Sequence, residues 1–390
     1  MKRIGYIYEP IIDLENCKRA IYNASVGKRH RGSVKDVLEN IDFYAKDLRH
    51  RLIMLDFLSP YRIRPIKDGL SGKERELQIP AFYPDQCAHH AIVQVLRPII
   101  ERSAYHWSCA NMPGRGIDMA SKGIERATKR DVRNAKYCVK LDIRKFYPSI
   151  PHDKLKERLR HKIKDTKALA ILDKVIDSYH FKGIDPLTGE EREYPQGLPI
   201  GNYTSPWFAE LFLQPLDMFI KQQLKVKHYV RYADDMVLTG GNKRKLRKAM
   251  YAVKEYVEGM GVNLKGNYQL FLVQEDKRYN PNPAAKRGRG RKIDFVGRCF
   301  GRGFTTIRKR RALALMRQSR KISKLQKAGK PVSYHMAAGF LSRSSCFRHT
   351  ESKKMKERYY DTVNVKKLKE VISNESKRQY QARCGGRDGV

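Results

Sequence analysis

The chain has 390 residues, of which 41% are hydrophobic, so it can bury a substantial core and is not a low-complexity polycation. Its 81 Lys and Arg residues outnumber its 41 Asp and Glu residues, which gives a net charge of +40. This charge favours a polyanionic partner over a basic surface without a ligand, because the positive charges of such a surface would repel one another. No apolar stretch reaches the length of a membrane span or a signal core, and the seven scattered cysteines favour a reducing cytoplasm over a disulfide framework or a structural zinc site.

The N-terminal part of the chain has the apolar periodicity of helices. Asp13 is expected to cap a first helix, and residues 34–52 show a second helical period. A further helix is expected over 85–100, where the apolar residues fall on one side. This region is therefore predicted to be mainly helical.

Two basic turns in the N-terminal half are candidate phosphate contacts. The stretch 67–77 carries Lys73 and Arg75, which could hold a triphosphate, although a solvated hairpin is an equal alternative. Arg115 lies between two glycines just before a helical segment at 117–128, a pattern that suits a phosphate contact close to the backbone.

A buried strand over 137–143 carries an acid near its end. Asp142 lies among apolar neighbours, so it needs a partner or a metal ion, unless it only starts the turn before Pro148. Tyr147 follows five residues later and could lie under a nucleotide sugar and exclude a 2′-hydroxyl. The alternative is that Tyr147 packs in the core.

Two helices, a polar insertion and a glycine-rich turn follow. The helices are expected over 153–160 and 168–179, and the insertion at 182–195 contains two turn signals. The glycine-rich turn leads into an apolar helix over 207–216. Gly201 would let the backbone approach a template base closely, unless the turn is an ordinary loop.

Tyr232, Ala233, Asp234 and Asp235 lie between two short strand-like runs and predict a β-hairpin with adjacent carboxylates at its tip. Like charges repel there, and a divalent cation removes the conflict. Mg²⁺ prefers carboxylate oxygens, and two such ions can activate a 3′-hydroxyl and stabilise a leaving pyrophosphate. A solvated acidic turn is the alternative.

The last part of the chain is basic. An amphipathic helix at 243–259 precedes a basic loop at 279–291, a short strand and turn at 293–297, and a basic helix at 308–326. Aromatic residues are interleaved with the charges, which suits stacking on nucleic-acid bases.

The order of strand with acid, helix, acidic hairpin, helix and strand predicts an α+β fold with a split βαββαβ palm. Fingers and a basic helical thumb would complete a right-hand polymerase. The expected regions are 1–139 for the N-terminal helices and fingers, 140–292 for the palm with 152–195 returning to the fingers, 293–378 for the thumb, and 379–390 for a disordered tail.

At this point the chain resembles the reverse transcriptases, over residues 73–320. Asp142 with Tyr147 looks like their first catalytic motif, and Tyr232 to Asp235 looks like their YxDD box. The resemblance implies RNA-templated DNA synthesis from dNTPs with two Mg²⁺ ions, Mn²⁺ being a substitute. It assigns the metals to Asp142, Asp234, Asp235 and the carbonyl of Ile143. Nucleotide contacts are assigned to Lys73, Arg75, Tyr147, Ile200, Gly201 and Lys265, and primer or template contacts to Arg115, Tyr232, Phe295 and Gly297.

A closer resemblance is to the enzymes of diversity-generating retroelements. Most reverse transcriptases have Gln-Gly where this chain has Ile200 and Gly201, and the retroelement enzymes have an aliphatic residue there. The resemblance implies a retroelement RNA template, low fidelity, a nascent cDNA and a small basic accessory protein. Ser205-Pro206 departs from the retroelement pattern, and antiphage-defence reverse transcriptases are the alternative, followed by a non-catalytic RNA-binding protein.

Overall fold

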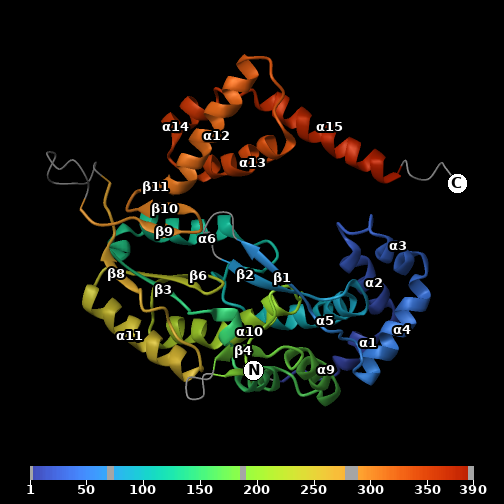
Figure 1. Ribbon diagram of the computed structural model, residues 1–390. Coiled ribbons are helices and arrows are strands. Elements are labelled where there is room, and N and C mark those ends of the chain that lie inside the picture. Colours follow the sequence, from blue (N-terminus) through green and yellow to red (C-terminus); the bar gives the residue numbers. More distant parts are fainter. Residues whose placement is uncertain (1–2, 68–73, 185–189, 277–288, 385–390) are drawn as a thin grey trace. The chain divides into compact units, whose positions relative to one another are not determined.

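The computed structural model describes residues 3–67, 74–184, 190–276 and 289–384, in which helices and strands are mixed along the chain (Figure 1). The chain divides into two units. The first contains Met1–Gly116, Lys140–Val237 and Arg247–Gln269, and the second contains Ile117–Val139, Leu238–Leu246 and Leu270–Val390. The expected α+β class is confirmed, and each unit is described by itself below.

Fifteen α-helices are found among the described residues: α1 (Tyr8–Ile12), α2 (Leu14–Ser25), α3 (Gly32–Glu39), α4 (Ile41–Met54), α5 (Cys87–Ser103), α6 (Ile117–Glu125), α7 (Phe146–Ser149), α8 (His152–Lys162), α9 (Thr166–Ile176), α10 (Ser205–Met218), α11 (Lys243–Gly259), α12 (Lys309–Lys327), α13 (Tyr334–Ser344), α14 (Lys353–Tyr359) and α15 (Val365–Cys384). The strands are β1 (Arg62–Lys67), β2 (Glu74–Ile79), β3 (Tyr137–Asp142), β4 (Phe181–Ile184), β5 (Glu191–Tyr194), β6 (His228–Tyr232), β7 (Asp235–Gly240), β8 (Gln269–Leu272), β9 (Ile293–Phe295), β10 (Arg298–Gly301) and β11 (Phe304–Ile307).

The N-terminal helices form as the apolar pattern predicts. The Asp13 carboxylate accepts a hydrogen bond from the Asn16 amide at 3.0 Å and so caps α2. The apolar face of α2 is buried against α4 and α5. The single helix expected over 34–52 is instead two helices, α3 and α4, which are separated at Asn40, where the backbone leaves the helical conformation.

Four strands form the central sheet, in the order β6-β7-β3-β8. Along the chain, helices α7–α10 and strands β4 and β5 lie between β3 and the β6–β7 hairpin, and α11 lies between that hairpin and β8. This is the βαββαβ arrangement expected for the palm, with the second hairpin strand next to the first strand of the motif. The end of β3, the whole of β6 and the start of β7 belong to the first unit.

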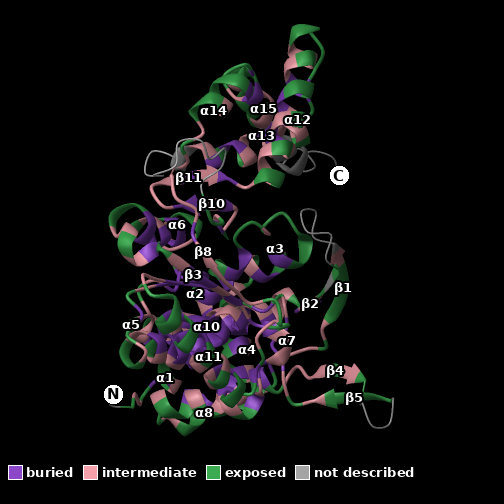
Figure 2. Ribbon diagram, turned by 90° about the vertical axis from the view of Figure 1, so that its left-hand side faces the viewer, coloured by how far each residue is buried: buried purple, intermediate pink, exposed green. Residues whose placement is uncertain are grey.

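Helix α10 is buried along nearly its whole length and forms much of the core of the first unit (Figure 2). It packs against α5 and α8. Its apolar residues include Phe208, Phe212 and Leu213, each at most 1% exposed. Burial on nearly all sides explains why its sequence is mostly apolar.

The second unit brings α6 together with the sheet β11-β10-β9. The guanidinium of Arg298 on β10 donates to Asp118 at 2.6 Å and to Ser121 at 2.5 Å, both on α6. Thr305 also donates to Glu125 at 2.7 Å. These contacts join segments about 180 residues apart, as the separations in the chain show. The expected boundary at 139 therefore differs from the observed division, in which residues 117–139 belong with the C-terminal part.

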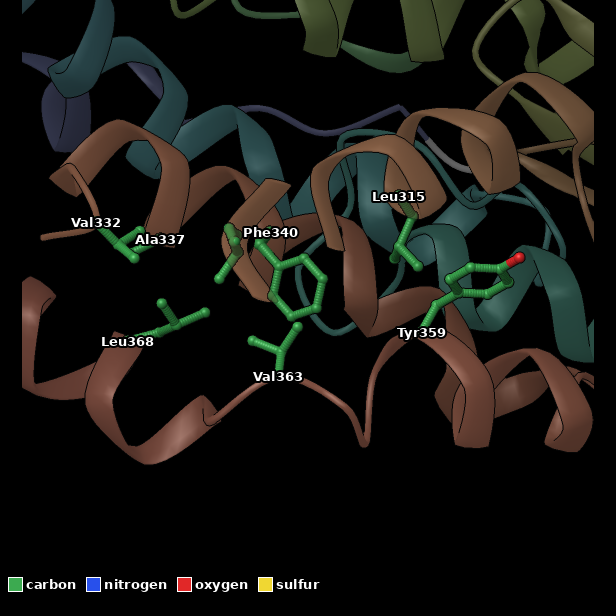
Figure 3. Packing of buried hydrophobic residues seen from close by; sticks show 8 residues of the cluster. Leu315, Val332, Ala337, Phe340, Tyr359, Val363 and Leu368 are labelled. Carbon is green, nitrogen blue, oxygen red and sulfur yellow. The ribbon is translucent and has the colours of Figure 1, made fainter. Parts of the chain in front are cut away.

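The C-terminal helices of the second unit have a core of their own (Figure 3). Leu315, Phe340, Val363 and Leu368 are among its buried members, and the Ser319 hydroxyl donates to the carbonyl of Tyr359. This matches the expected helical thumb. Helix α15 continues to Cys384, so the expectation of a disordered tail is wrong for residues 379–384. None of the helices in the described part of the chain combines the length and apolarity of a membrane span.

Candidate active site

The acidic hairpin forms where the sequence predicts it. Strands β6 and β7 are joined by a turn of two residues, Ala233 and Asp234, and Asp235 begins β7. Ala233 has a φ of 53°, the left-handed conformation that tight turns require and that alanine rarely adopts. The backbone therefore holds the two carboxylates at the tip of the hairpin, with Tyr232 half-buried beside them.

Asp142 is brought to this hairpin from the end of β3. The segment after it pairs with the chain at Leu264, and the Lys265 amide donates to the Asp142 carbonyl at 2.8 Å. The Lys265 ammonium also lies 2.5 Å from the Asp142 carboxylate. Lys265 therefore reaches the first acid through both its backbone and its side chain.

The electrostatics show that the three acids act on one another. Burial first, and then the charges of Asp142 and Asp235, raise the pKa of Asp234 to about 6, and Lys265 opposes the rise. Asp142 and Asp235 keep 28% and 40% of their side chains exposed, so their oxygens are open to solvent. The structure thus brings together three acids of which the first lies 92 residues before the second.

This donor set fits a hard divalent cation. Carboxylate oxygens are the ligands that such ions prefer, and a cation would remove the repulsion that raises the Asp234 pKa. Two ammonium groups also lie near the acids, Lys265 at Asp142 and Lys140 at 3.9 Å from Asp235. The carbonyl of Ile143, a residue that is fully buried, stays a predicted ligand.

Tyr147 lies beside the acids, on the short helix α7. Burial raises the pKa of its hydroxyl to about 12, the nearby Asp234 charge acts in the same direction, and a hydrogen bond with Asn111 opposes them. The Tyr147 carbonyl accepts the Leu198 amide at 2.8 Å, which ties α7 to the glycine-rich turn. The Tyr147 side chain is half-buried and not fully enclosed in the core. A ligand bound at the three acids could therefore contact its ring.

The glycine-rich turn is held by a residue that the sequence did not single out. Gln78 on β2 accepts the Ile200 amide through its side chain at 2.9 Å, and its own amide donates to the Ile200 carbonyl at 3.0 Å. A Cβ on Gly201, whose φ is 143°, would lie 2.2 Å from the Gln78 carbonyl oxygen. The approach of β2 is enough to require glycine here, and the contact of Gly201 with a template base stays a prediction.

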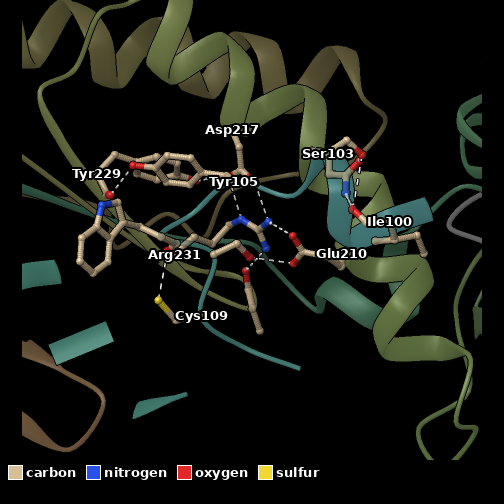
Figure 4. A network of polar contacts seen from close by, with 12 residues as sticks. Ile100, Ser103, Tyr105, Cys109, Glu210, Asp217, Tyr229 and Arg231 are labelled. Carbon is tan, nitrogen blue, oxygen red and sulfur yellow. Dashed lines mark hydrogen bonds and ion pairs between the residues drawn. The ribbon is translucent and has the colours of Figure 1, made fainter. Parts of the chain in front are cut away.

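A buried charge network lies behind the hairpin (Figure 4). Arg231 is 1% exposed and makes a bidentate contact with Asp217 on α10, at 2.8 and 2.6 Å. The Arg231 guanidinium also donates to Glu210 at 3.0 Å, Tyr229 donates to Asp217 at 2.7 Å, and Ser108 donates to Glu210 at 2.8 Å. Burial raises the pKa of Asp217, and Arg231 opposes the rise.

The network reaches the acidic turn directly, because Arg231 also donates to the Ala233 carbonyl at 3.2 Å. Its members were not predicted from the sequence. The sequence does contain a pattern that indicates the network. An otherwise apolar helix carries a stripe of polar residues at spacings of four and three, namely Glu210, Gln214 and Asp217. A buried stripe of this kind requires a charged partner.

The other predicted site residues are placed as follows. Arg115 donates to the carbonyls of Tyr105 and Ser108, at 2.6 and 2.9 Å, which gives it a structural role, and its phosphate contact stays a prediction. Lys73 lies outside the described residues, and of Arg75 only the backbone in β2 is described. In the second unit Phe295 is fully buried and Gly297 has a φ of 81°, so any primer contact there belongs to the turn rather than to the Phe295 ring.

Comparisons with known proteins place the chain in one family. The family model "Reverse transcriptase (RNA-dependent DNA polymerase)" matches residues 70–274, which is more than half of the chain. The Group II intron-encoded protein LtrA of Lactococcus lactis subsp. cremoris is 30% identical over 168 residues, 43% of this chain and 26% of that protein. Protein YkfC of Escherichia coli is 25% identical over 154 residues, 39% of each chain. The matched part thus spans well under half of these relatives.

Two solved structures are similar at a distance. Telomerase from Candida albicans with a TWJ fragment of telomeric RNA has 14% identity and a TM-score of 0.44, covering 85% of this chain and 62% of that one. Truncated apo telomerase from Candida tropicalis has 13% identity and a TM-score of 0.44, covering 68% and 60%.

Proposed function

The chain belongs to the reverse transcriptase family, and on this premise we propose that it copies an RNA template into DNA from dNTPs. The observation that carries the proposal is the meeting of Asp142, Asp234 and Asp235 at one end of the sheet. An RNA-binding protein without activity would not require three acids to be held together against their repulsion. The high positive charge supports an RNA template and a nascent cDNA as partners.

The three carboxylates would hold the divalent ions, Mg²⁺ or its substitute Mn²⁺. When bound, such ions activate the 3′-hydroxyl of the primer and stabilise the leaving pyrophosphate. Lys265 orients Asp142 through its contact at 2.5 Å, and its ammonium is a proton donor within the site. Tyr147 presents its ring beside Asp234, where it would select deoxynucleotides against ribonucleotides.

We also propose that the template is a retroelement RNA and that copying is error-prone. The Group II intron relative supports a mobile-element origin, and the aliphatic Ile200 in place of a glutamine supports loosened base selection. A small basic accessory protein would follow from the resemblance to the diversifying retroelements. An antiphage-defence role is the alternative, because it requires the same chemistry.

Primer extension tests the activity. The full chain, a defined RNA template with an annealed DNA primer, four dNTPs and Mg²⁺ should give a DNA product complementary to the template. Chelation of the metal should abolish it. If the protein binds this RNA with steep salt dependence yet extends no primer, the non-catalytic alternative is correct.

Sequencing that product tests the fidelity. Ile200→Gln should lower the error rate, with the largest change at template adenines, because the added amide braces the template–nucleotide pair. Ile200→Leu is the matched control, since it keeps an aliphatic side chain at that position. An error spectrum that is unchanged in Ile200→Gln would remove low fidelity from the proposal.

A further inference from the structure

A second group of ligand-type side chains lies in the first unit, away from the three acids in the sequence. His152 begins α8, Asp177 follows α9, and His180 precedes β4. One ligand atom from each residue lies within 4.8 Å of the other two. No compact motif marks them in the sequence, because His152 is 25 residues from Asp177, and for that reason zinc was not expected.

The hydrogen bonding of His152 leaves one ring nitrogen without a partner. Its Nε2 lies 2.9 Å from the Gly197 carbonyl oxygen, and because a carbonyl only accepts, Nε2 carries the proton and donates. The lone pair is therefore on Nδ1. That atom is buried in a residue that is 2% exposed, and it has no hydrogen-bond partner among the residues that the structure describes. A buried acceptor without a partner requires an explanation, and a bound ion is one.

The surroundings of this nitrogen are those of a metal ligand. Metal-binding histidines usually donate their other N–H to a carbonyl or carboxylate, as His152 does to Gly197. Asp177 presents Oδ1 at 3.6 Å from His152 Nδ1, while Lys156 holds its Oδ2 at 2.6 Å and so orients the carboxylate. The rings of His152 and His180 have centroids 5.5 Å apart.

We propose that His152 Nδ1, Asp177 Oδ1 and a ring nitrogen of His180 bind one Zn²⁺ ion, with water as the fourth ligand. Two imidazoles and a carboxylate suit Zn²⁺, whereas Mg²⁺ prefers oxygen ligands alone. Asp177 keeps 47% of its side chain exposed, so the site has an open side for water and for entry of the ion. Small rotations of the exposed Asp177 and half-buried His180 side chains would bring the ligand atoms to bonding distance.

The ion would act as a structural clamp. It would join the start of α8, the end of α9 and the β4–β5 hairpin. The start of α8 already meets the base of the hairpin through the backbone, because the His152 amide donates to Pro195 at 3.1 Å and the Phe181 amide donates to Gln196 at 2.9 Å. The inserted segment 182–195, which has no function predicted from the sequence, would thus be fixed at its base. This proposal does not depend on the polymerase activity.

The test measures how many Zn²⁺ ions the full chain binds and how Zn²⁺ changes its melting temperature. Excess Mg²⁺ is present so that it occupies the site at Asp142, Asp234 and Asp235. Wild type should retain one Zn²⁺ after dialysis and melt at a higher temperature with Zn²⁺ than with a chelator. His180→Ala and Asp177→Asn should each lower the Zn²⁺ affinity by at least about 10–100-fold, the loss typical of even an outer-shell partner. His180→Asp, which keeps a ligand atom, should recover part of the binding.

His161→Ala is the matched control. This exposed histidine also lies on α8 and faces a carboxylate, at 3.4 Å from Glu157, but it is not part of the cluster. It should bind Zn²⁺ as wild type does. The proposal is overturned if wild type retains no Zn²⁺, or if Asp177→Asn and His180→Ala bind it as tightly as His161→Ala. Asp177 is half-exposed, so Asp177→Asn is expected to fold. This variant therefore tests the proposed Zn²⁺ site even if a histidine variant does not fold.

Discussion

The ionised carboxylate of Asp234 lowers the stability of the folded chain, because it is largely buried and lies near two other acids. Its pKa is raised to about 6 by burial first and then by Asp142 and Asp235, whereas the unfolded chain has the ordinary value of 3.8. Between about pH 4 and pH 6 the folded chain therefore binds more protons than the unfolded one, and stability falls as the pH rises through this range. A divalent cation bound by Asp234 would relieve this cost, so the proposed reaction would use the ion that the fold needs.

The loss of stability on ionisation of Asp234 predicts how a substitution changes the metal-free protein. Asp234→Asn should raise the free energy of unfolding at pH 7 by about 1–2 kcal/mol, allowing for partial exposure, because it removes the buried charge. The gain should shrink as the pH falls below 6 and vanish at about pH 3, where the carboxyl is protonated in both states. Urea unfolding at the two pH values measures it, with the exposed Glu39→Gln as control. An equal gain at both pH values would contradict the assignment of the charge.

Tyr147 is the residue expected to read the nucleotide sugar. Tyr147→Ala should lower the preference for dNTP over rNTP in primer extension by at least about 10-fold, or about 1.4 kcal/mol, because the ring no longer occupies the space of a 2′-hydroxyl. Tyr147→Phe keeps the ring and loses only the Asn111 contact, so it should keep the preference. Equal preferences in the Ala and Phe variants would show that the ring does not act as a gate.

At the scale of elements, the β6–β7 hairpin depends on the charges buried behind it. Arg231 links α10 to the turn through Asp217, Glu210 and the Ala233 carbonyl. Removing one partner of a buried ion pair leaves an uncompensated charge, whereas replacing the whole group by apolar residues is often neutral. The network therefore positions the turn more than it stabilises the fold.

Arg231→Ala should cost about 3–5 kcal/mol in urea unfolding. Arg62→Ala, an exposed arginine on β1, should change stability by less than about 0.5 kcal/mol. The triple variant Arg231→Met, Glu210→Leu and Asp217→Leu should recover much of the stability while DNA synthesis stays low, because the Ala233 carbonyl has lost its donor. Full synthesis in a stable triple variant would contradict a positioning role.

Elements with a strong local pattern could be predicted from the sequence, and tertiary contacts could not. Helix α11 has the expected bounds because its amphipathic period is unbroken, and the hairpin follows from two short strands around a turn. The meeting of Asp142 with Asp234 needed the family resemblance, since no local rule relates residues so far apart. Gln78, which holds Ile200 from 122 residues away, carried no signal in the sequence.

At the scale of the whole molecule, the excess of 81 basic over 41 acidic residues predicts general affinity for nucleic acid, and we expect a few side chains to select the substrate. The two units divide the chain differently from the expected fingers, palm and thumb, because Arg298 joins the C-terminal sheet to α6. The three acids and Tyr147 all lie within the first unit. The central claim can therefore be tested by substitutions in that unit alone.

The most direct test is the single-turnover rate of adding one dNTP to a DNA primer on an RNA template. Asp142→Asn, Asp234→Asn and Asp235→Asn should each lower this rate by at least about 10³-fold, or about 4 kcal/mol in the barrier, while Glu39→Gln should leave it unchanged. Rates within about 10-fold of wild type in any of the three aspartate variants, with the fold intact, would contradict the account.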